Sequence, residues 1–154
     1  MQKTLVFTFV AVMLCACGGN KKQQEMNNIS NKEKAVALLK SIETGASEPI
    51  AYVNAKNYKQ HNLTVADGLD GLGAALAAMA EQGIKMEYFT IHKILGCGNF
   101  ILAVSEGAFA GQPTSYYDLF RIENGKIAEH WDVMETIAPE GEWKHQNGKY
   151  NFPK

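Results

Sequence analysis

Hydrophobic and polar residues alternate with a period of two from Ile84 to the end of the domain, which is the pattern of half-buried β-strands. The alternation predicts four strands, over residues 85–95, 100–109, 115–123 and 126–137. Short turn sequences, GCGN, GQP and ENG, separate them. Strands joined by such short connections pair as antiparallel hairpins.

The chain before these strands has helical spacing instead. Residues 32–42 place four apolar side chains on one helical face: Ala35, Leu38, Leu39 and Ile42. A short second helix is expected after the N-cap Ser47, over residues 48–56, and a third between Asp67 and Gly83. Helices followed by a run of hairpins predict an α+β domain in which the helices cover one face of a curved antiparallel sheet.

The last two predicted strands carry ionisable residues, and the register of their hairpin decides which side chains share a face. A two-residue loop, Asn124-Gly125, places Asp118 opposite Trp131. A three-residue loop, which adds the preceding glutamate, places Asp118 opposite His130. Local chemistry alone leaves both registers open.

In the three-residue register one face is a mostly apolar wall with three titratable groups: Tyr116, Asp118, Phe120, Ile122, Ala128, His130, Asp132 and Met134. The opposite face carries Tyr117, Leu119, Arg121, Ile127, Glu129, Trp131 and Val133. Because this second face also needs partial cover, the pattern predicts a subunit contact and therefore a homodimer.

Composition adds limits to this picture. The chain has 154 residues, 46% of them hydrophobic and 20% charged, which is typical of a single globular domain with a substantial core. Its formal net charge of -1 leaves no broad basic surface of the kind that nucleic-acid binding requires. Nucleic acid is therefore not an expected partner.

The N-terminus has the pattern of a secretory signal: Lys3 followed by an apolar run, residues 5–14, that is too short to be a permanent membrane span. The segment LCAC resembles the bacterial lipobox, with Cys17 as the residue that would be acylated. The alternative is an ordinary signal peptide cut near Ala16. The lipobox predicts a signal peptide over residues 1–16 and a lipid anchor on Cys17, on the periplasmic or outer side of a bacterial membrane.

Residues 17–31 are polar and low in aliphatic side chains, as in a flexible tether, and residues 32–154 form the domain. With Cys17 acylated, Cys97 is the only remaining thiol of the domain sequence, so no intramolecular disulfide is expected. We interpret Cys97 as a small core residue.

Two stretches resemble a known family. The sequence YKQHN with VADG (residues 58–62 and 65–68), and DLFR through GKI to EHWD (residues 118–132), resemble the SnoaL-like polyketide cyclases, in particular the branch described as predicted aldol-condensation enzymes. The resemblance extends over roughly residues 32–152. It implies the cone-shaped fold of nuclear transport factor two, in which a curved antiparallel sheet and three N-terminal helices enclose a deep apolar pocket.

The resemblance also implies a catalytic set: His61, Asp118, His130 and Asp132. Asp118 matches the strand position of the proton-donating acid of ketosteroid isomerase, a fold relative, and His61 falls near that enzyme's general base. His130 and Asp132 match the His-Trp-Asp motif of the SnoaL-like branch, whereas Val104 stands where many members of that branch have a further histidine. The fold relatives favour the three-residue loop.

The implied activity is cofactor-independent acid/base chemistry on a small, largely apolar carbonyl compound, as in aldol cyclases, isomerases and hydratases. Such a reaction needs a base, an acid and an apolar cavity. We expect His130, held by Asp132 or Asp118, to be the base, with the remaining acid or His61 as the proton donor. No cofactor and no metal is expected, although two histidines and a carboxylate are a known metal-ligand set.

Each residue also has a structural interpretation. His61 would end the second helix, Asp118 and His130 would form a cross-strand pair, and Asp132 would be a solvated carboxylate. The alternative function is a non-catalytic envelope lipoprotein that binds a hydrophobic small molecule or a protein partner. The fold alone cannot decide between the two.

Overall fold

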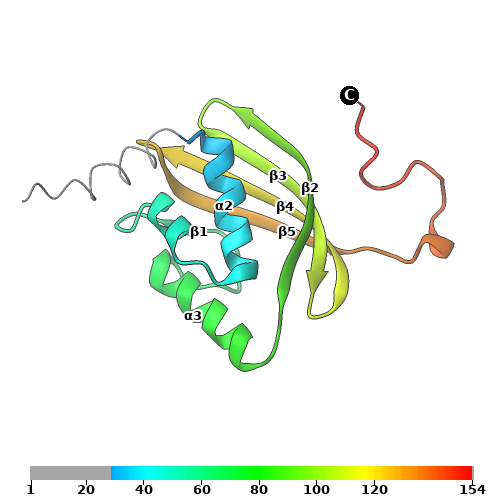
Figure 1. Ribbon diagram of the computed structural model, residues 1–154, viewed down its shortest axis with the longest axis horizontal. Helices are drawn as coiled ribbons and strands as arrows, with labels where there is room; N and C mark the ends of the chain where they lie inside the picture. Colours follow the sequence, from blue (N-terminus) through cyan, green and yellow to red (C-terminus); the bar gives the residue numbers. More distant parts are fainter. Residues whose placement is uncertain (1–28, 154) are drawn as a thin grey trace, which may run out of the picture.

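The computed structural model describes residues 29–153 and contains a five-stranded, curved sheet with two α-helices against one face (Figure 1). The strands are β1 (Lys59–Gln60), β2 (Met86–Cys97), β3 (Phe100–Phe109), β4 (Gln112–Glu123) and β5 (Lys126–Thr136). Their order in the sheet is β1-β5-β4-β3-β2, with β2 to β5 antiparallel and β1 parallel to β5. The four strands predicted from the period of two are therefore present, and β1 is an addition.

The helices are α2 (Asn31–Thr44) and α3 (Gly68–Glu81). Helix α2 begins at a capping box, in which the Ser30 hydroxyl accepts from the Glu33 amide and the Glu33 carboxylate accepts from the Ser30 amide. The core lies between these helices and the sheet, with Leu38 and Leu39 of α2 packed in one cluster with Tyr116 and Phe120 of β4. The helices thus cover the sheet face that carries the candidate site.

The expected second helix is a short 3₁₀-helix, η1 (Glu48–Tyr52), and the three-helix arrangement is not confirmed in the described residues. The chain becomes extended at Val53, which is buried and forms a parallel bridge with Ile127 at the start of β5. The following Asn54 amide donates to the Ile127 carbonyl at 2.8 Å. Pairing with the sheet edge therefore ends the helix before it can reach residue 56.

The hairpin between β4 and β5 turns through Asn124 and Gly125, because Glu123 pairs with Lys126. Both turn residues have positive φ, 50° and 73°, as a two-residue type I′ turn requires. The two-residue loop is therefore the one that forms, and the three-residue loop is wrong.

A β-bulge then corrects the register. Ile122 pairs with Ile127, whereas Arg121 pairs with Glu129, so Ala128 is an extra residue on β5. One extra residue reverses the face of every later side chain on that strand.

The bulge brings Asp118, His130 and Asp132 to one face, as the three-residue loop would have done by another route. The pairing itself differs from both expected registers, because Asp118 lies opposite Asp132 and His130 lies opposite Phe120. Ile127, expected on the outer face, is fully buried in the core.

The opposite, outer face of the sheet is only partly covered. Phe89, Leu95, Phe100 and Val133 are exposed there or at its edge. The C-terminal segment folds back onto part of this face, since the Tyr150 hydroxyl donates to the Ser105 carbonyl at 3.3 Å and its ring stacks on His92. Cys97, expected in the core, is exposed at the end of β2.

The expected signal peptide, the expected anchor Cys17 and most of the expected tether lie outside the described residues. Within residues 29–153 no helix is long and apolar enough to cross a membrane. Ser30 and Asn31, which the expected tether included, form the N-cap and the first residue of α2.

Candidate functional site

Asp118 lies near the middle of β4, on the covered face of the sheet, and its side chain is fully buried. Its Oδ1 lies 3.1 Å from His130 Nε2, whereas Oδ2 has no hydrogen-bond partner among the described residues. Buried polar atoms nearly always have a partner, so an unpartnered carboxylate oxygen is a costly feature to keep. Such features are concentrated at functional sites.

His130 is held from three sides. Phe120, directly opposite on β4, stacks on the imidazole with ring centroids 4.7 Å apart and an interplanar angle of 11°. Asp118 meets Nε2, and the Gln60 side-chain amide approaches Nδ1 at 3.4 Å. His130 is 8% exposed, and these contacts fix the orientation of its ring. The residue also lines the cavity described below.

The Gln60 amide indicates which imidazole nitrogen carries the proton. Its Oε1 accepts from the Asn62 backbone N–H at 3.1 Å, so its Nε2 faces His130 Nδ1 and the Tyr58 hydroxyl. An amide N–H facing Nδ1 favours a lone pair on that atom. The proton then lies on Nε2 and is donated to Asp118 Oδ1, leaving Nδ1 as the basic nitrogen.

Burial and neighbouring charges shift the pKa of two groups at this site, Asp118 and Tyr58. Burial raises the pKa of Asp118, the hydrogen bond and charge of His130 oppose this, and the nearby charge of Asp132 adds to it. Burial, with the charges of Asp132 and Asp118, also raises the pKa of the Tyr58 phenol, which therefore stays protonated. The hydrogen bond between His130 Nε2 and Asp118 Oδ1 joins the two side chains in the buried interior.

Strand β1 positions the polar side chains around His130. It pairs parallel to β5, with Gln60 opposite His130, and the His61 amide donates to the His130 carbonyl at 2.9 Å. The Asp67 carboxylate, at the start of α3, accepts from the Gln60 backbone N–H at 2.9 Å. The short strand is therefore fixed at both the sheet and the helix.

Asn62 extends the same arrangement to the second carboxyl. Its side-chain Nδ2 donates to Asp132 Oδ2 at 2.9 Å. Asp132 is partly exposed and is therefore not the freely solvated carboxylate of the structural interpretation. One segment of five residues, 58–62, thus orients both His130 and Asp132.

These groups border a cavity of about 100 Å³ between the helices and the sheet. Gln60, Asn62, His130 and Asp132 form its polar side, and aliphatic, thioether and aromatic side chains of α2, α3, β2 and β3 form most of the rest. Asp118 is not part of the wall and lies beneath His130. In residues 29–153, no three His, Cys, Asp or Glu side chains are grouped as metal ligands would be.

Of the four residues expected from the sequence, the structure brings Asp118, His130 and Asp132 together, but not His61. The His61 imidazole lies on the outer face of the sheet, where its Nε2 is 2.7 Å from Glu129 Oε2 and its ring stacks on Trp131 at 4.1 Å. Strand alternation explains the difference, because His61 lies between Gln60 and Asn62, which point to the cavity. His61 is also not a helix terminus.

Gln60, Asn62 and Tyr58 belong to the site although the sequence did not single them out. The sequence YKQHN contains the signal. If it forms a strand, Gln60 and Asn62 point to one face and His61 to the other. A two-residue strand is too short for that period to be recognised from the sequence.

The sequence matches no family model and no curated protein. The structure is similar to several solved structures. An NTF2-like protein of unknown function from Cytophaga hutchinsonii has a TM-score of 0.55 at 16% identity, covering 70% of this chain and 91% of that one. IdmH from Streptomyces antibioticus, named as a candidate polyketide cyclase, has a TM-score of 0.51 at 15% identity, with 69% and 93% covered.

A candidate polyketide cyclase from Bacillus cereus has a TM-score of 0.52 at 21% identity, covering 70% of this chain and 79% of that chain. Likenesses at this level of identity establish the fold and leave the activity to be argued from the site. The chain therefore has the NTF2-like fold of the SnoaL-like candidate polyketide cyclases, as its sequence motifs implied.

Proposed function

We propose that this protein is a cofactor-independent acid/base enzyme that moves a proton next to the carbonyl group of a small, largely apolar compound. The observation that carries the proposal is the buried Asp118–His130 pair, with one imidazole nitrogen held by the carboxylate and the other directed toward Gln60 at the cavity wall. Aldol cyclisation, isomerisation and dehydration all begin with such a proton transfer.

In the proposed reaction, His130 Nδ1 removes a proton from the carbon next to the carbonyl, and the electron pair of that C–H bond moves into the enolate. The imidazolium formed is stabilised by Asp118 through the Nε2–H···Oδ1 hydrogen bond. This interaction lies in a water-poor interior, where charge stabilisation is stronger than in solution. Asp118 thus supports the base without touching the substrate.

The enolate oxygen needs a hydrogen-bond donor, and Gln60 supplies one. In the free protein its Nε2 donates to the Tyr58 hydroxyl at 3.2 Å and makes a longer contact, 3.4 Å, with His130 Nδ1. A bound carbonyl compound that takes the place of this contact would receive the same N–H on its oxygen. The proton taken up by His130 Nδ1 can then return to the oxygen or to another carbon of the enolate. Asp132, held by Asn62, is the further carboxyl group at the cavity wall.

The test is proton exchange in deuterated water. The full chain is incubated with 2-butanone, and loss of the signal of the protons next to the carbonyl is followed by proton NMR. Exchange above the buffer rate is expected, and His130→Gln should abolish it. His145→Gln is the matched control, because His145 lies in the exposed C-terminal segment, away from the cavity.

A ligand-binding protein is the second candidate, because most of the cavity wall is apolar and Asp118 does not reach it. Ketone binding without exchange would support this function and contradict catalysis. We also propose that Cys17 anchors the domain by lipid in the cell envelope; mass spectrometry of the N-terminal peptide, with Cys17→Ser as control, tests this.

A homodimer through the outer face remains part of the proposal. The exposed apolar side chains of Leu95, Phe100 and Val133 support it, since exposed apolar surface is often covered in an assembly. Sedimentation equilibrium of the full chain and of Val133→Lys tests this arrangement. A monomeric wild-type protein would contradict it.

A further inference from the structure

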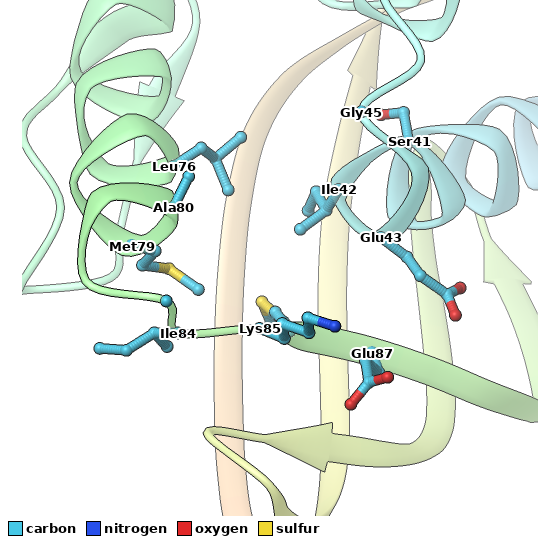
Figure 2. Close-up of a pocket in the computed structure, with 12 residues that line it drawn as sticks. Ser41, Ile42, Glu43, Gly45, Leu76, Met79, Ala80, Ile84, Lys85 and Glu87 are labelled. Carbon is cyan, nitrogen blue, oxygen red and sulfur yellow. The ribbon is translucent and has the colours of Figure 1, made fainter.

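A second hollow lies between the C-terminal ends of α2 and α3 and the beginning of β2 (Figure 2). Its volume is about 550 Å³, several times that of the cavity beside His130. Figure 2 shows Leu76 and Met79 of α3 facing Ile42 of α2 across it. We call this hollow the interhelical groove.

The groove and the His130 cavity are adjacent. Four apolar residues, Ile42, Leu76, Met79 and Met86, line both. These side chains therefore separate the two spaces, and two of them are methionines, whose flexible thioether chains adapt easily to an inserted group. A ligand that extends from the cavity into the groove would therefore displace these side chains.

The two spaces differ in chemistry. The cavity has polar groups on one side. The groove is lined mainly by aliphatic and methionine side chains, and three charged residues also line it: Glu43, Lys85 and Glu87. Glu43 and Lys85 are exposed, so the charges mark the side that meets water. Such a sequence of environments suits a molecule with a polar head, an apolar middle and an end near solvent.

The size of the cavity limits what can bind beside His130. Pockets for whole drug-sized ligands are roughly 300–1,000 Å³, and the cavity has about 100 Å³. Only a small head group fits there, so any larger substrate must place its remaining atoms elsewhere. The groove is the adjoining space of sufficient volume.

We infer that the substrate is a linear ketone with an unbranched alkyl tail, whose carbonyl lies beside His130 and whose tail lies in the interhelical groove. This inference rests on the proposed function for the role of the carbonyl, but the tail site can be tested by binding alone. An unbranched chain requires less displacement of the four shared side chains than a broad, rigid ring system does.

The experiment uses a series of probes, 2-butanone, 2-hexanone, 2-octanone and 2-decanone, with the full chain. Each methylene buried in the groove should tighten binding about fourfold, which corresponds to roughly 0.8 kcal/mol. The expected result is a dissociation constant that falls along the series, with amide shift changes at Ala80 and Ile84 only for the longer ketones. Binding is followed by two-dimensional proton–nitrogen NMR.

Ala80→Trp is the blocking variant, because Ala80 is an exposed residue of α3 that lines the groove. It should reduce the ratio of 2-decanone to 2-butanone affinity by at least tenfold. Ala78→Trp is the matched control, since Ala78 is also exposed on α3 but lines neither space, and it should preserve the ratio.

The outcomes separate the two proposals. Tightening with tail length that Ala80→Trp removes, but without proton exchange for any ketone, would uphold the tail site and contradict the enzyme function. Proton exchange with ketone affinities that do not depend on tail length would uphold the enzyme function and contradict the tail site. Tightening that both tryptophan variants leave unchanged would place the tail outside the groove and overturn the inference.

Discussion

Asp118 and Asp132 lie directly opposite each other across the β4–β5 ladder, and each is held by a different donor. His130 meets the buried Asp118, and the Asn62 amide donates to Asp132 at the cavity wall. Opposite residues of an antiparallel pair have Cβ atoms only about 4.5–5.5 Å apart, so two ionised carboxylates would repel. The arrangement therefore separates the two groups into a buried supporting carboxyl and a cavity-facing acid.

Asp118→Asn should lower kcat/KM for proton exchange at 2-butanone by about two orders of magnitude or more. An asparagine amide can donate to Nε2, which favours the tautomer in which Nδ1 carries the proton and cannot act as a base. Exchange rates of the two proteins measure the effect. Asp70→Asn, at an exposed position of α3, is the matched control, and near-full activity of Asp118→Asn would contradict the role of Asp118.

Stability should depend on pH through Asp118. Burial raises the pKa of Asp118 in the folded protein, whereas an aspartate in an unfolded chain has a pKa of about 3.9. As the pH rises, the Asp118 carboxyl therefore loses its proton in the unfolded chain before it does so in the folded protein. The contribution of Asp118 to the free energy of unfolding is therefore full below about pH 4 and decreases as the pH rises through the folded-state pKa.

Urea unfolding of the wild type and Asp118→Asn between pH 3.5 and 7 checks this sign. The wild type should lose stability relative to the variant as the pH increases. Parallel stability curves would show that Asp118 titrates equally in both states.

Gly107 tests the close approach between β3 and the backbone of β2. A Cβ atom added there would lie 1.7 Å from the Glu87 carbonyl oxygen on β2, so Gly107→Ala must displace backbone. We expect a loss of about 2 kcal/mol or more in the free energy of unfolding. Gly73→Ala is the contrasting control, since a Cβ on this α3 residue meets no atom within 4 Å and should stabilise the protein by about 0.5–1 kcal/mol. Equal changes in the free energy of unfolding for Gly107→Ala and Gly73→Ala would contradict this account of Gly107.

Much of the fold follows from local patterns in the sequence. The period of two placed β2 to β5, and helical spacing placed α2 and α3, because each element buries one face in the same core. The length of the second helix was overestimated, because Val53 pairs with Ile127, a residue far away in the sequence. Tertiary pairing of this kind leaves no local signal.

Part of the site was also predictable from a local pattern, the alternation of side chains along the strands. Strand alternation placed Asp118, His130 and Asp132 on one face, but through the wrong turn, because the bulge at Ala128 has no sequence signature of its own. His61 was selected because it falls near the position of the general base of ketosteroid isomerase. The alternation of β1 instead directs Gln60 and Asn62 to the cavity and His61 to the outer face.

The protonation of His130 tests the central claim most directly. Nitrogen-15 NMR of histidine-labelled protein distinguishes a protonated ring nitrogen from one with a free lone pair. We predict that, in the neutral ring, Nε2 carries the proton toward Asp118 and Nδ1 has the lone pair, and that Asp118→Asn reverses this assignment. A neutral wild-type ring with its proton on Nδ1 would contradict the proposal that this atom is the base.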